Sequence, residues 1–524
     1  MDFSIPRLAC ADRFVSSSVA VRHAERSISY GELAQESSQV ANGLRALGVK
    51  AGDRVAVISR NSIESIEVLL GISKIGGVPV FLNWRLSLQE LADLLDDARP
   101  VAVFMQQEFS EGLQATLSKL SFPSSALVFD SSELEVSYRH WKDQYESDLE
   151  LSVERPEDVA AQLYTSGTTG RAKGAMLTKQ GFAESITDAV TFWQMRADSR
   201  VLCVLPMFHI AGLGTIVGAL WAKAQIVLSD AVHPEGILAA IESAEITHLI
   251  LVSVMLQALV ASPACARARL TSLETISYGA APISVSTLNQ ALELMDCRIV
   301  QPYGLTETTG VVSLLDNADH RRFANDPTQQ HRLASCGKPR AGVEVKVVNP
   351  DSGESLPANT PGELWVKTGR LMIGYANLPS ATREALPGGG WFRTGDIATL
   401  DPEGYITLKD RLKDVIISGG ENIYPVEVEN ALMAYPEIAD VAVIGQPSEL
   451  WGETPVAIVV CKSDAQVTEQ QVIAFSREQL AHFKCPSQVF FVRELPRNAT
   501  GKVLRKALRQ DTSWRGVSDA STPN

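Results

Sequence analysis

The sequence lacks the signatures of several common protein classes. Its 7 cysteines are widely scattered and form no CxxC pair, which argues against a zinc site and a disulfide framework. The formal net charge of −14 argues against a general nucleic-acid binder, because such proteins neutralise phosphates with Lys and Arg. Neither an internal repeat nor a low-complexity segment is present. We therefore expect a soluble globular protein in a reducing, cytoplasmic setting.

No segment has the features of a secretory signal or a membrane span. The N-terminal residues lack the basic start and apolar core of a signal peptide. Residues 201–222 and 246–266 carry no formal charge and are long enough to cross a bilayer. However, Pro206 interrupts the first stretch and Pro263 the second. We predict a buried strand followed by a helix in each.

Hydrophobic patterning predicts the fold class. From residue 30 to about residue 260, short apolar runs alternate with helical patterns, which is typical of βαβ units and mostly parallel sheets. After residue 340, short strands of antiparallel character follow, with Asp396 expected at the start of a hairpin and a type I turn at 401–404. We predict an α/β protein with a large N-terminal part (1–410), a charged boundary (411–414), a small α+β domain (415–512) and a frayed tail (513–524).

The segment Tyr164–Gly174 is the most informative part of the chain. It follows an apolar run and contains three glycines, four Ser or Thr hydroxyls and one lysine. Glycines let backbone N–H groups face an anion, hydroxyls add donors, and Lys173 supplies a mobile charge, so the loop can hold phosphates. It is not a Walker loop, because Lys173 follows Gly170 by three residues and is itself followed by glycine. A flexible turn is the alternative for the loop alone.

A second polar segment, Gln301–Gly310, combines an aromatic ring, hydroxyls and one carboxylate. Tyr303 could stack on a base, Thr306 could bond a phosphate oxygen, and Glu307 could hold Mg²⁺, which takes one or two carboxylates when it binds substrate phosphates. The alternative is a surface turn with a solvated glutamate.

Five further positions are ambiguous on local grounds. Asp396 could accept hydrogen bonds from both hydroxyls of a ribose or serve as a turn residue. Arg411 and Lys413 could be solvated boundary charges, and Lys502 lies on a glycine-containing loop where a lysine is usually solvated. His209 is expected to end a strand, either as a core residue or as the wall of a substrate pocket.

Together these segments resemble the adenylate-forming superfamily of acyl-CoA synthetases, peptide-synthetase adenylation domains and firefly luciferase. The resemblance runs from about residue 12 to residue 510 and rests on five motifs in order: Thr165–Gly174, Tyr303–Glu307, Thr394–Asp396, Asp410–Lys413 with Gly419–Ile423, and Asn498–Lys502. One departure is Ala172, where the family usually has proline; it removes no donor to phosphate.

The resemblance implies a role for each matching position. The phosphates of ATP would be held by Thr165, Ser166, Gly167, Thr168, Thr169, Gly170 and Lys173. The adenine would lie against Gly279, Ala280, Ala281, Gln301, Pro302, Tyr303 and Gly304. Thr306 would contact the α-phosphate, Glu307 the Mg²⁺, and Asp396 with Arg411 the ribose. Lys502 would reach the substrate carboxylate and the α-phosphate, Lys413 would be the hinge, and Gly419 and Gly420 would approach coenzyme A (CoA).

The implied reaction joins a carboxylic acid to AMP and then transfers the acyl group to CoA after the small domain rotates. The acid would lie near His209, Met255, Ala280, Gly304 and Gly310. The surrounding segments are small or apolar and lack an acidic partner for an amino group, so a fatty, branched or aromatic monocarboxylate is expected rather than an amino acid. An acyl-AMP ligase that loads a carrier protein, a luciferase-like oxygenase and a non-catalytic nucleotide-binding protein remain alternatives, and a homodimer remains open.

Overall fold

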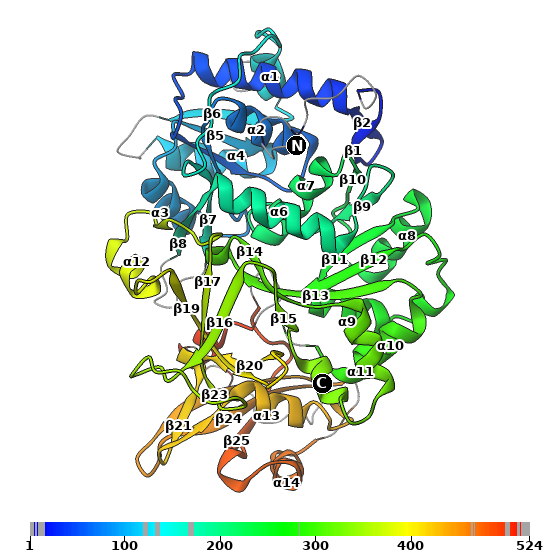
Figure 1. The fold of residues 1–524 in the computed structure, drawn as a ribbon, viewed down its shortest axis with the longest axis vertical. Helices are drawn as coiled ribbons and strands as arrows, with labels where there is room; N and C mark the ends of the chain where they lie inside the picture. The colour runs from blue at the N-terminus through cyan, green and yellow to red at the C-terminus, as the bar shows by residue number, and fades with distance from the viewer. Residues whose placement is uncertain are drawn as a thin grey trace, which may run out of the picture.

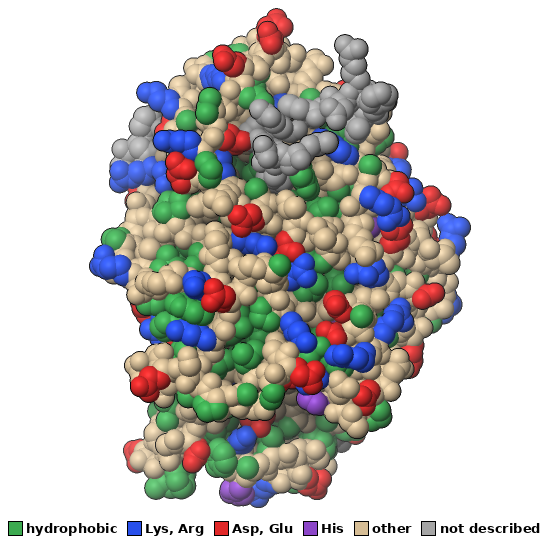
Figure 2. Space-filling model, viewed as in Figure 1, with side chains coloured by type: hydrophobic (Ala, Val, Ile, Leu, Met, Phe, Trp, Pro, Cys, Tyr) green, Lys and Arg blue, Asp and Glu red, His purple; other side chains and the backbone are tan. Residues whose placement is uncertain are grey.

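The computed structural model describes residues 5, 8, 16–118, 124–131, 137–165, 172–281, 283–462, 465, 467–497, 503–510 and 514. These residues form five β-sheets, and the C-terminal part lies below the larger N-terminal part in Figure 1. On the face shown in Figure 2, acidic and basic side chains are interspersed. The negative net charge is therefore not gathered into one patch on this face.

A four-stranded parallel sheet forms the first layer, in the order β4-β3-β5-β6. Its strands are β3 (Arg54–Ile58), β4 (Val78–Phe81), β5 (Ala102–Gln106) and β6 (Ser125–Phe129). The accompanying helices are α1 (Tyr30–Ala46), α2 (Ile63–Lys74), α3 (Leu88–Ala98), α4 (Gln107–Leu117) and α5 (Tyr138–Lys142). Serines at 29, 62 and 87 form capping boxes, which explains where the first three helices begin.

A nine-stranded sheet forms the second layer, in the order β15-β14-β13-β12-β11-β9-β10-β1-β2. Its strands are β1 (Val19–His23), β2 (Arg26–Ser29), β9 (Arg200–Cys203), β10 (Gln225–Leu228), β11 (His248–Val252), β12 (Thr275–Gly279), β13 (Arg298–Leu305), β14 (Gly310–Leu315) and β15 (Lys338–Pro339). The strands from β13 to β1 pair in parallel, and both edges are antiparallel.

The helices of this region are α6 (Lys179–Trp193), α7 (Ile210–Trp221), α8 (Pro234–Ala244), α9 (Ser253–Ala261), α10 (Val285–Leu294) and α11 (Asn317–Asn325). Helix α6 crosses the middle of the molecule in Figure 1 and contacts α7. The uncharged stretches 201–222 and 246–266 contain β9 with α7 and β11 with α9, which confirms the predicted strand–helix units. Among the described residues, no helix is both long and apolar enough to cross a membrane.

Two antiparallel sheets complete the N-terminal part. The first joins β7 (Val159–Thr165), β8 (Lys173–Thr178) and β18 (Gly374–Tyr375). The second, in the order β16-β17-β19-β20, consists of β16 (Val343–Val348), β17 (Gly362–Thr368), β19 (Trp391–Leu400) and β20 (Ile406–Arg411), with α12 (Pro379–Ala385) before β19. Asp396 lies within β19 and opens its antiparallel ladder with β20, where it faces Arg411, which confirms its expected place at the start of this hairpin; β19 itself begins earlier, at Trp391. The turn at 401–404 is closed by a hydrogen bond from the Gly404 N–H to the Asp401 carbonyl oxygen (3.0 Å).

The C-terminal part has its own sheet and its own buried apolar clusters. The strands are β21 (Ile416–Ser418), β22 (Glu421–Ile423), β23 (Ile438–Ser448), β24 (Gly452–Cys461) and β25 (Gln488–Phe491), with α13 (Pro425–Leu432), α14 (Glu469–Gln479) and α15 (Arg505–Gln510). Trp514 is only 6% exposed and its indole N–H donates to the Leu508 carbonyl oxygen. The predicted frayed tail is therefore wrong at Trp514. The α/β fold class with a β-rich subdomain and a small α+β part is confirmed.

Candidate active site

The two ends of the glycine-rich loop are held by a β-hairpin. Thr165 ends β7 and Lys173 begins β8, and these two residues face each other in the ladder. The hairpin was not expected from the sequence, which predicted only an apolar run before the loop. The predicted phosphate-binding residues Ser166, Gly167, Thr168, Thr169 and Gly170 lie outside the described residues.

Glu307 lies at the centre of a polar cluster beside this hairpin. It belongs to a single 3₁₀ turn, η3 (Thr306–Thr308), that follows β13, and it is 9% exposed. Two hydroxyl groups point to its Oε1: that of Tyr375 at 2.8 Å and that of Thr165 at 3.4 Å. The Lys173 Nζ lies 5.0 Å from the centre of the Tyr375 ring. The alternative of a solvated surface glutamate at position 307 is therefore wrong.

The surroundings of Glu307 fit a magnesium ion that is bound mainly by substrate phosphates. Within the described ranges, no three His, Cys, Asp or Glu side chains gather closely enough to form a metal cage. Magnesium does not need such a cage when phosphate oxygens and water complete its octahedron. Since both hydroxyl groups donate to Oε1, Glu307 keeps Oε2 free of any bond to a described residue. Glu307 can therefore hold Mg²⁺ bound to ATP.

Asp396 and Arg411 form a second cluster, at the adjoining end of the β-rich subdomain. They face each other across β19 and β20, and the Arg411 Nε lies 2.8 Å from Asp396 Oδ1. The Tyr303 hydroxyl donates to Asp396 Oδ2 at 2.6 Å. Burial and the Asp396 charge both raise the pKa of the Tyr303 phenol, so Tyr303 remains a donor. The structure thus brings Tyr303 beside a carboxylate that lies 93 positions later in the chain and is paired with Arg411.

The end of β12 lies close to β13. The Ser253 hydroxyl contacts the carbonyl oxygens of both Gly279 (3.1 Å) and Ala281 (2.5 Å). A Cβ atom on Gly279 would lie 3.0 Å from the Pro302 carbonyl oxygen, so this position favours glycine. Ala280 has a φ of +67°, a left-handed conformation that is uncommon outside glycine. Ala280 is exposed, and Gly279 and Ala281 are partly buried. Gln301, also assigned to the adenine pocket, accepts a hydrogen bond from the buried Tyr278 hydroxyl (3.3 Å).

Gly304 and Gly310 permit the close antiparallel pairing of β13 and β14. A Cβ atom on Gly304 would lie 1.8 Å from the Gly310 carbonyl oxygen. Gly310 has a φ of +111°, and a Cβ atom there would lie 2.7 Å from the Ser185 hydroxyl. These glycines are required by the backbone itself, in addition to the substrate role that the resemblance implied.

His209 lies at the beginning of α7 and not at the end of a strand, because β9 already ends at Cys203. Its Nε2 is buried and has no hydrogen-bond partner among the described atoms. Burial, aided by the charge of Arg85, lowers its pKa to about 4, so His209 is neutral near pH 7. Met255 lies on α9 and is half-buried. A neutral His209 with an unsatisfied nitrogen suits a pocket wall.

The segment between the two parts is a charged turn. Lys413 lies in η5 (Leu412–Asp414), and burial is the main cause that lowers its pKa. Next to it, the Arg505 guanidinium lies 2.7 Å from Glu429, 3.7 Å from Asp410 and 3.9 Å from Asp414. Gly419 and Gly420 form the turn between β21 and β22, with φ values of +59° and +87°. Lys502 lies outside the described residues.

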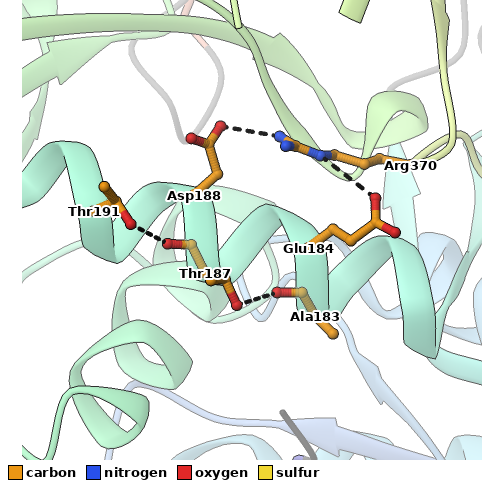
Figure 3. A pocket seen from close by; sticks show the side chains of 6 residues that line it. All are labelled: Ala183, Glu184, Thr187, Asp188, Thr191 and Arg370. Atoms are coloured by element: carbon orange, nitrogen blue, oxygen red, sulfur yellow. Dashed lines mark hydrogen bonds and ion pairs between the residues drawn. The ribbon is translucent and has the colours of Figure 1, made fainter. Parts of the chain in front are cut away.

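A cavity of about 380 Å³ elsewhere on α6 is separate from these clusters. Figure 3 shows Arg370 paired there with Asp188 (3.0 Å) and with Glu184 (3.9 Å). The Arg370 carbonyl oxygen accepts a hydrogen bond from the Thr309 hydroxyl. The Arg370 backbone therefore helps to fix Thr309, two residues after Glu307.

Two functional candidates were missed by the sequence analysis. Tyr375 contacts Glu307, and Arg505 contacts Asp410, across 68 and 95 positions of the chain. Tyr375 merely follows a glycine, and Arg505 lies in a short basic helix. Neither residue is marked by a local sequence pattern. Only the pairing of β18 with β8 and the packing of α15 reveal them.

Known proteins resemble this chain over nearly its whole length. Residues 9–376 match the profile of the AMP-binding enzyme family, and residues 427–502 match that of the AMP-binding enzyme C-terminal domain. The chain is 36% identical to a feruloyl-CoA synthase of an Amycolatopsis species, over 95% of this chain and 96% of that protein. It is 34% identical to the fatty acid–[acyl-carrier-protein] ligase ScoC of Streptomyces coeruleorubidus, over 93% and 92% of the two chains.

Among solved structures, ATP-bound MatB from Rhodopseudomonas palustris is 30% identical and superimposes with a TM-score of 0.89, covering 97% of this chain and 99% of that one. Apo MatB superimposes with a TM-score of only 0.78 at the same coverage. From the motifs, the fold and these matches together, the chain belongs to the AMP-binding, adenylate-forming enzyme family.

Proposed function

We propose that this protein is an AMP-forming acyl-CoA synthetase that activates a fatty, branched or aromatic monocarboxylic acid. The observation that carries the proposal is the convergence of three features: a hairpin presenting Thr165 and Lys173, the buried Glu307, and the Asp396–Arg411 pair with Tyr303. Each suits one part of MgATP: the phosphates, the metal and the ribose. The relatives named as CoA ligases support the same reaction class.

In the first half-reaction, a carboxylate oxygen of the acid attacks the α-phosphorus of ATP. The bond from the α-phosphorus to the bridging oxygen breaks, and pyrophosphate leaves with the electron pair. Carboxylate and triphosphate repel each other, so the protein must mainly neutralise charge and align the groups. Lys173, Thr306 and Lys502 supply donors to the phosphates, and Mg²⁺ held by Glu307 would spread the remaining negative charge.

In the second half-reaction, the CoA thiolate attacks the acyl carbon and AMP leaves. We assign the hinge between the N-terminal part (1–410) and the C-terminal domain (415–512) to residues 411–414, with Lys413 as the pivot. Rotation about this turn would withdraw Lys502 and bring Gly419 and Gly420 toward the site. The separate sheets and separate apolar clusters of the two parts support such a rigid-body motion.

The acid would bind beside His209, Met255, Ala280, Gly304 and Gly310. His209 is neutral and the glycines and alanine are small, so an uncharged acyl group fits better than one with a second charge. The six described cysteines are free thiols, which supports a reducing compartment such as the cytoplasm. The similarity to ScoC keeps a carrier-protein thiol as the alternative acceptor.

ATP–pyrophosphate exchange with a panel of acids tests the first half-reaction. Ferulate-like aryl acids and fatty acids of graded length should be included, and AMP release with added CoA tests the second. Exchange with at least one acid, followed by CoA-dependent thioester formation, is the expected result. If no acid supports exchange and calorimetry detects no ATP binding, the proposal is contradicted.

A further inference from the structure

Tyr375 occupies a fixed place beside the loop-bearing hairpin. It belongs to β18, which pairs with β8 so that Tyr375 faces Ala175. Its backbone N–H donates to the Thr382 hydroxyl (2.9 Å), and the N–H of the next residue, Ala376, donates to the Gly174 carbonyl oxygen (2.8 Å). The backbone on both sides of the ring is therefore tied down, and the side chain is buried.

The two ends of this side chain contact different members of the proposed site. The hydroxyl group donates to Glu307 Oε1 at 2.8 Å, which is shorter than the 3.4 Å contact of Thr165 with the same oxygen. The ring face lies 5.0 Å from the Lys173 ammonium group, within the range of a cation–π interaction. One tyrosine therefore links the lysine of the phosphate loop to the carboxylate of the metal site.

We propose that Tyr375 is a positioning residue that orients Glu307 for the metal and Lys173 for the phosphates. Its hydroxyl donates to Oε1 and leaves Oε2 available to the metal, as outer-sphere hydrogen bonds do for metal-binding carboxylates. Its ring keeps the flexible lysine side chain beside the hairpin before the nucleotide arrives. This inference rests on the proposed function, in which Glu307 holds Mg²⁺ bound to ATP.

The test is Tyr375→Phe, which removes only the hydroxyl and keeps the ring under Lys173. Mn²⁺ would replace Mg²⁺, and its binding to the full-length protein with saturating ATP would be followed by electron paramagnetic resonance. We expect Mn²⁺ to bind about 10- to 100-fold more weakly, the usual effect of losing such a hydrogen bond. Metal-free ATP should bind as in the wild type. Tyr375→Leu, which also removes the ring, should weaken both.

Tyr405→Phe is the matched control. Tyr405 is itself buried, and its hydroxyl donates to the Asp319 carboxylate at 3.0 Å outside the proposed site, so Mn²⁺ and ATP binding should not change. Thr165→Val removes the longer contact and should weaken Mn²⁺ binding less than Tyr375→Phe. Thermal unfolding of each variant reports whether the fold is kept.

The outcomes separate the inference from the function on which it rests. If the wild type shows no ATP-dependent Mn²⁺ binding, the proposed function fails. If the wild type binds Mn²⁺ and Tyr375→Phe binds it equally well, only the positioning role fails. Equal loss in Tyr375→Phe and Tyr405→Phe would also overturn it, because the effect would then be a general one of losing a buried tyrosine hydroxyl.

Discussion

Asp410 connects the two parts of the chain across the proposed hinge. It lies in β20, before Lys413, and its side chain is 1% exposed. Its Oδ2 accepts a hydrogen bond from the N–H of Val426 in α13 (2.9 Å), and Arg505 of α15 lies 3.7 Å from its Oδ1. Both partners follow the hinge in sequence, so rotation about Lys413 must disturb these contacts. We therefore expect Asp410 to stabilise the arrangement seen here.

Asp410→Asn tests this role with little change in shape. A hydrogen bond to a charged group contributes about 1.5–3 kcal/mol and a neutral one about 0.5–1.5 kcal/mol, so the arrangement should lose about 1–1.5 kcal/mol. Since 1.4 kcal/mol corresponds to a factor of ten in an equilibrium constant, its population relative to the rotated form should fall by up to about tenfold. The chain as a whole superimposes better on ATP-bound MatB (TM-score 0.89) than on apo MatB (0.78), so we expect adenylate formation to suffer most.

The assay separates the two half-reactions. ATP–pyrophosphate exchange measures the first, and thioester formation from a supplied acyl-adenylate measures the second. We expect slower exchange and unimpaired thioester formation. Glu427→Gln is the control, because it breaks an ion pair with Lys484 (2.7 Å) inside the C-terminal domain and should alter neither. Equal slowing of both half-reactions by Asp410→Asn, or of neither, would refute the reasoning.

Three further predictions concern other residues. Lys502→Ala should abolish pyrophosphate exchange but spare thioester formation from supplied acyl-adenylate; equal loss in both would contradict a lysine that acts in one half-reaction. Asp396→Asn should raise the Kd for ATP about five- to tenfold, because replacing a charged acceptor for the ribose by a neutral one beside Arg411 costs about 1–1.5 kcal/mol, and an unchanged Kd in calorimetry would exclude the ribose role. Burial raises the pKa of Glu67 from 4.5 to about 7 in the folded protein. The contribution of Glu67 to stability should therefore fall as the pH rises from about 4.5 to 7, because the folded state retains a proton at Glu67 that the unfolded state has lost. Glu67→Gln should reduce this fall in the free energy of unfolding, measured by urea denaturation at pH 5 and pH 7.5, and identical pH dependence in both proteins would contradict the raised pKa.

Local chemistry explains why much of the fold could be predicted. Each uncharged stretch forms a strand followed by a helix. A short apolar run predicts a buried strand, and apolar residues three to four positions apart predict a helix that packs on the sheet. Helices begin at serines whose side chains satisfy free N–H groups, and the turn at Gly404 follows from Asp, Pro and Gly at the right offsets. Predictions failed where an element's end depended on a distant partner, as for His209 and Trp514.

The sequence by itself determined which chemical groups the site contains: the glycine- and hydroxyl-rich loop, one carboxylate at 307, and the aspartate and arginine at 396 and 411. Their type and order are enough to recognise the family. Only the tertiary structure decided that Tyr375 lies between Lys173 and Glu307, and that Arg505 faces Asp410. The physical reason is that these contacts depend on how strands pair and how the C-terminal helix packs across the charged turn. Such long-range pairing leaves no periodicity or motif in the sequence around Tyr375 or Arg505.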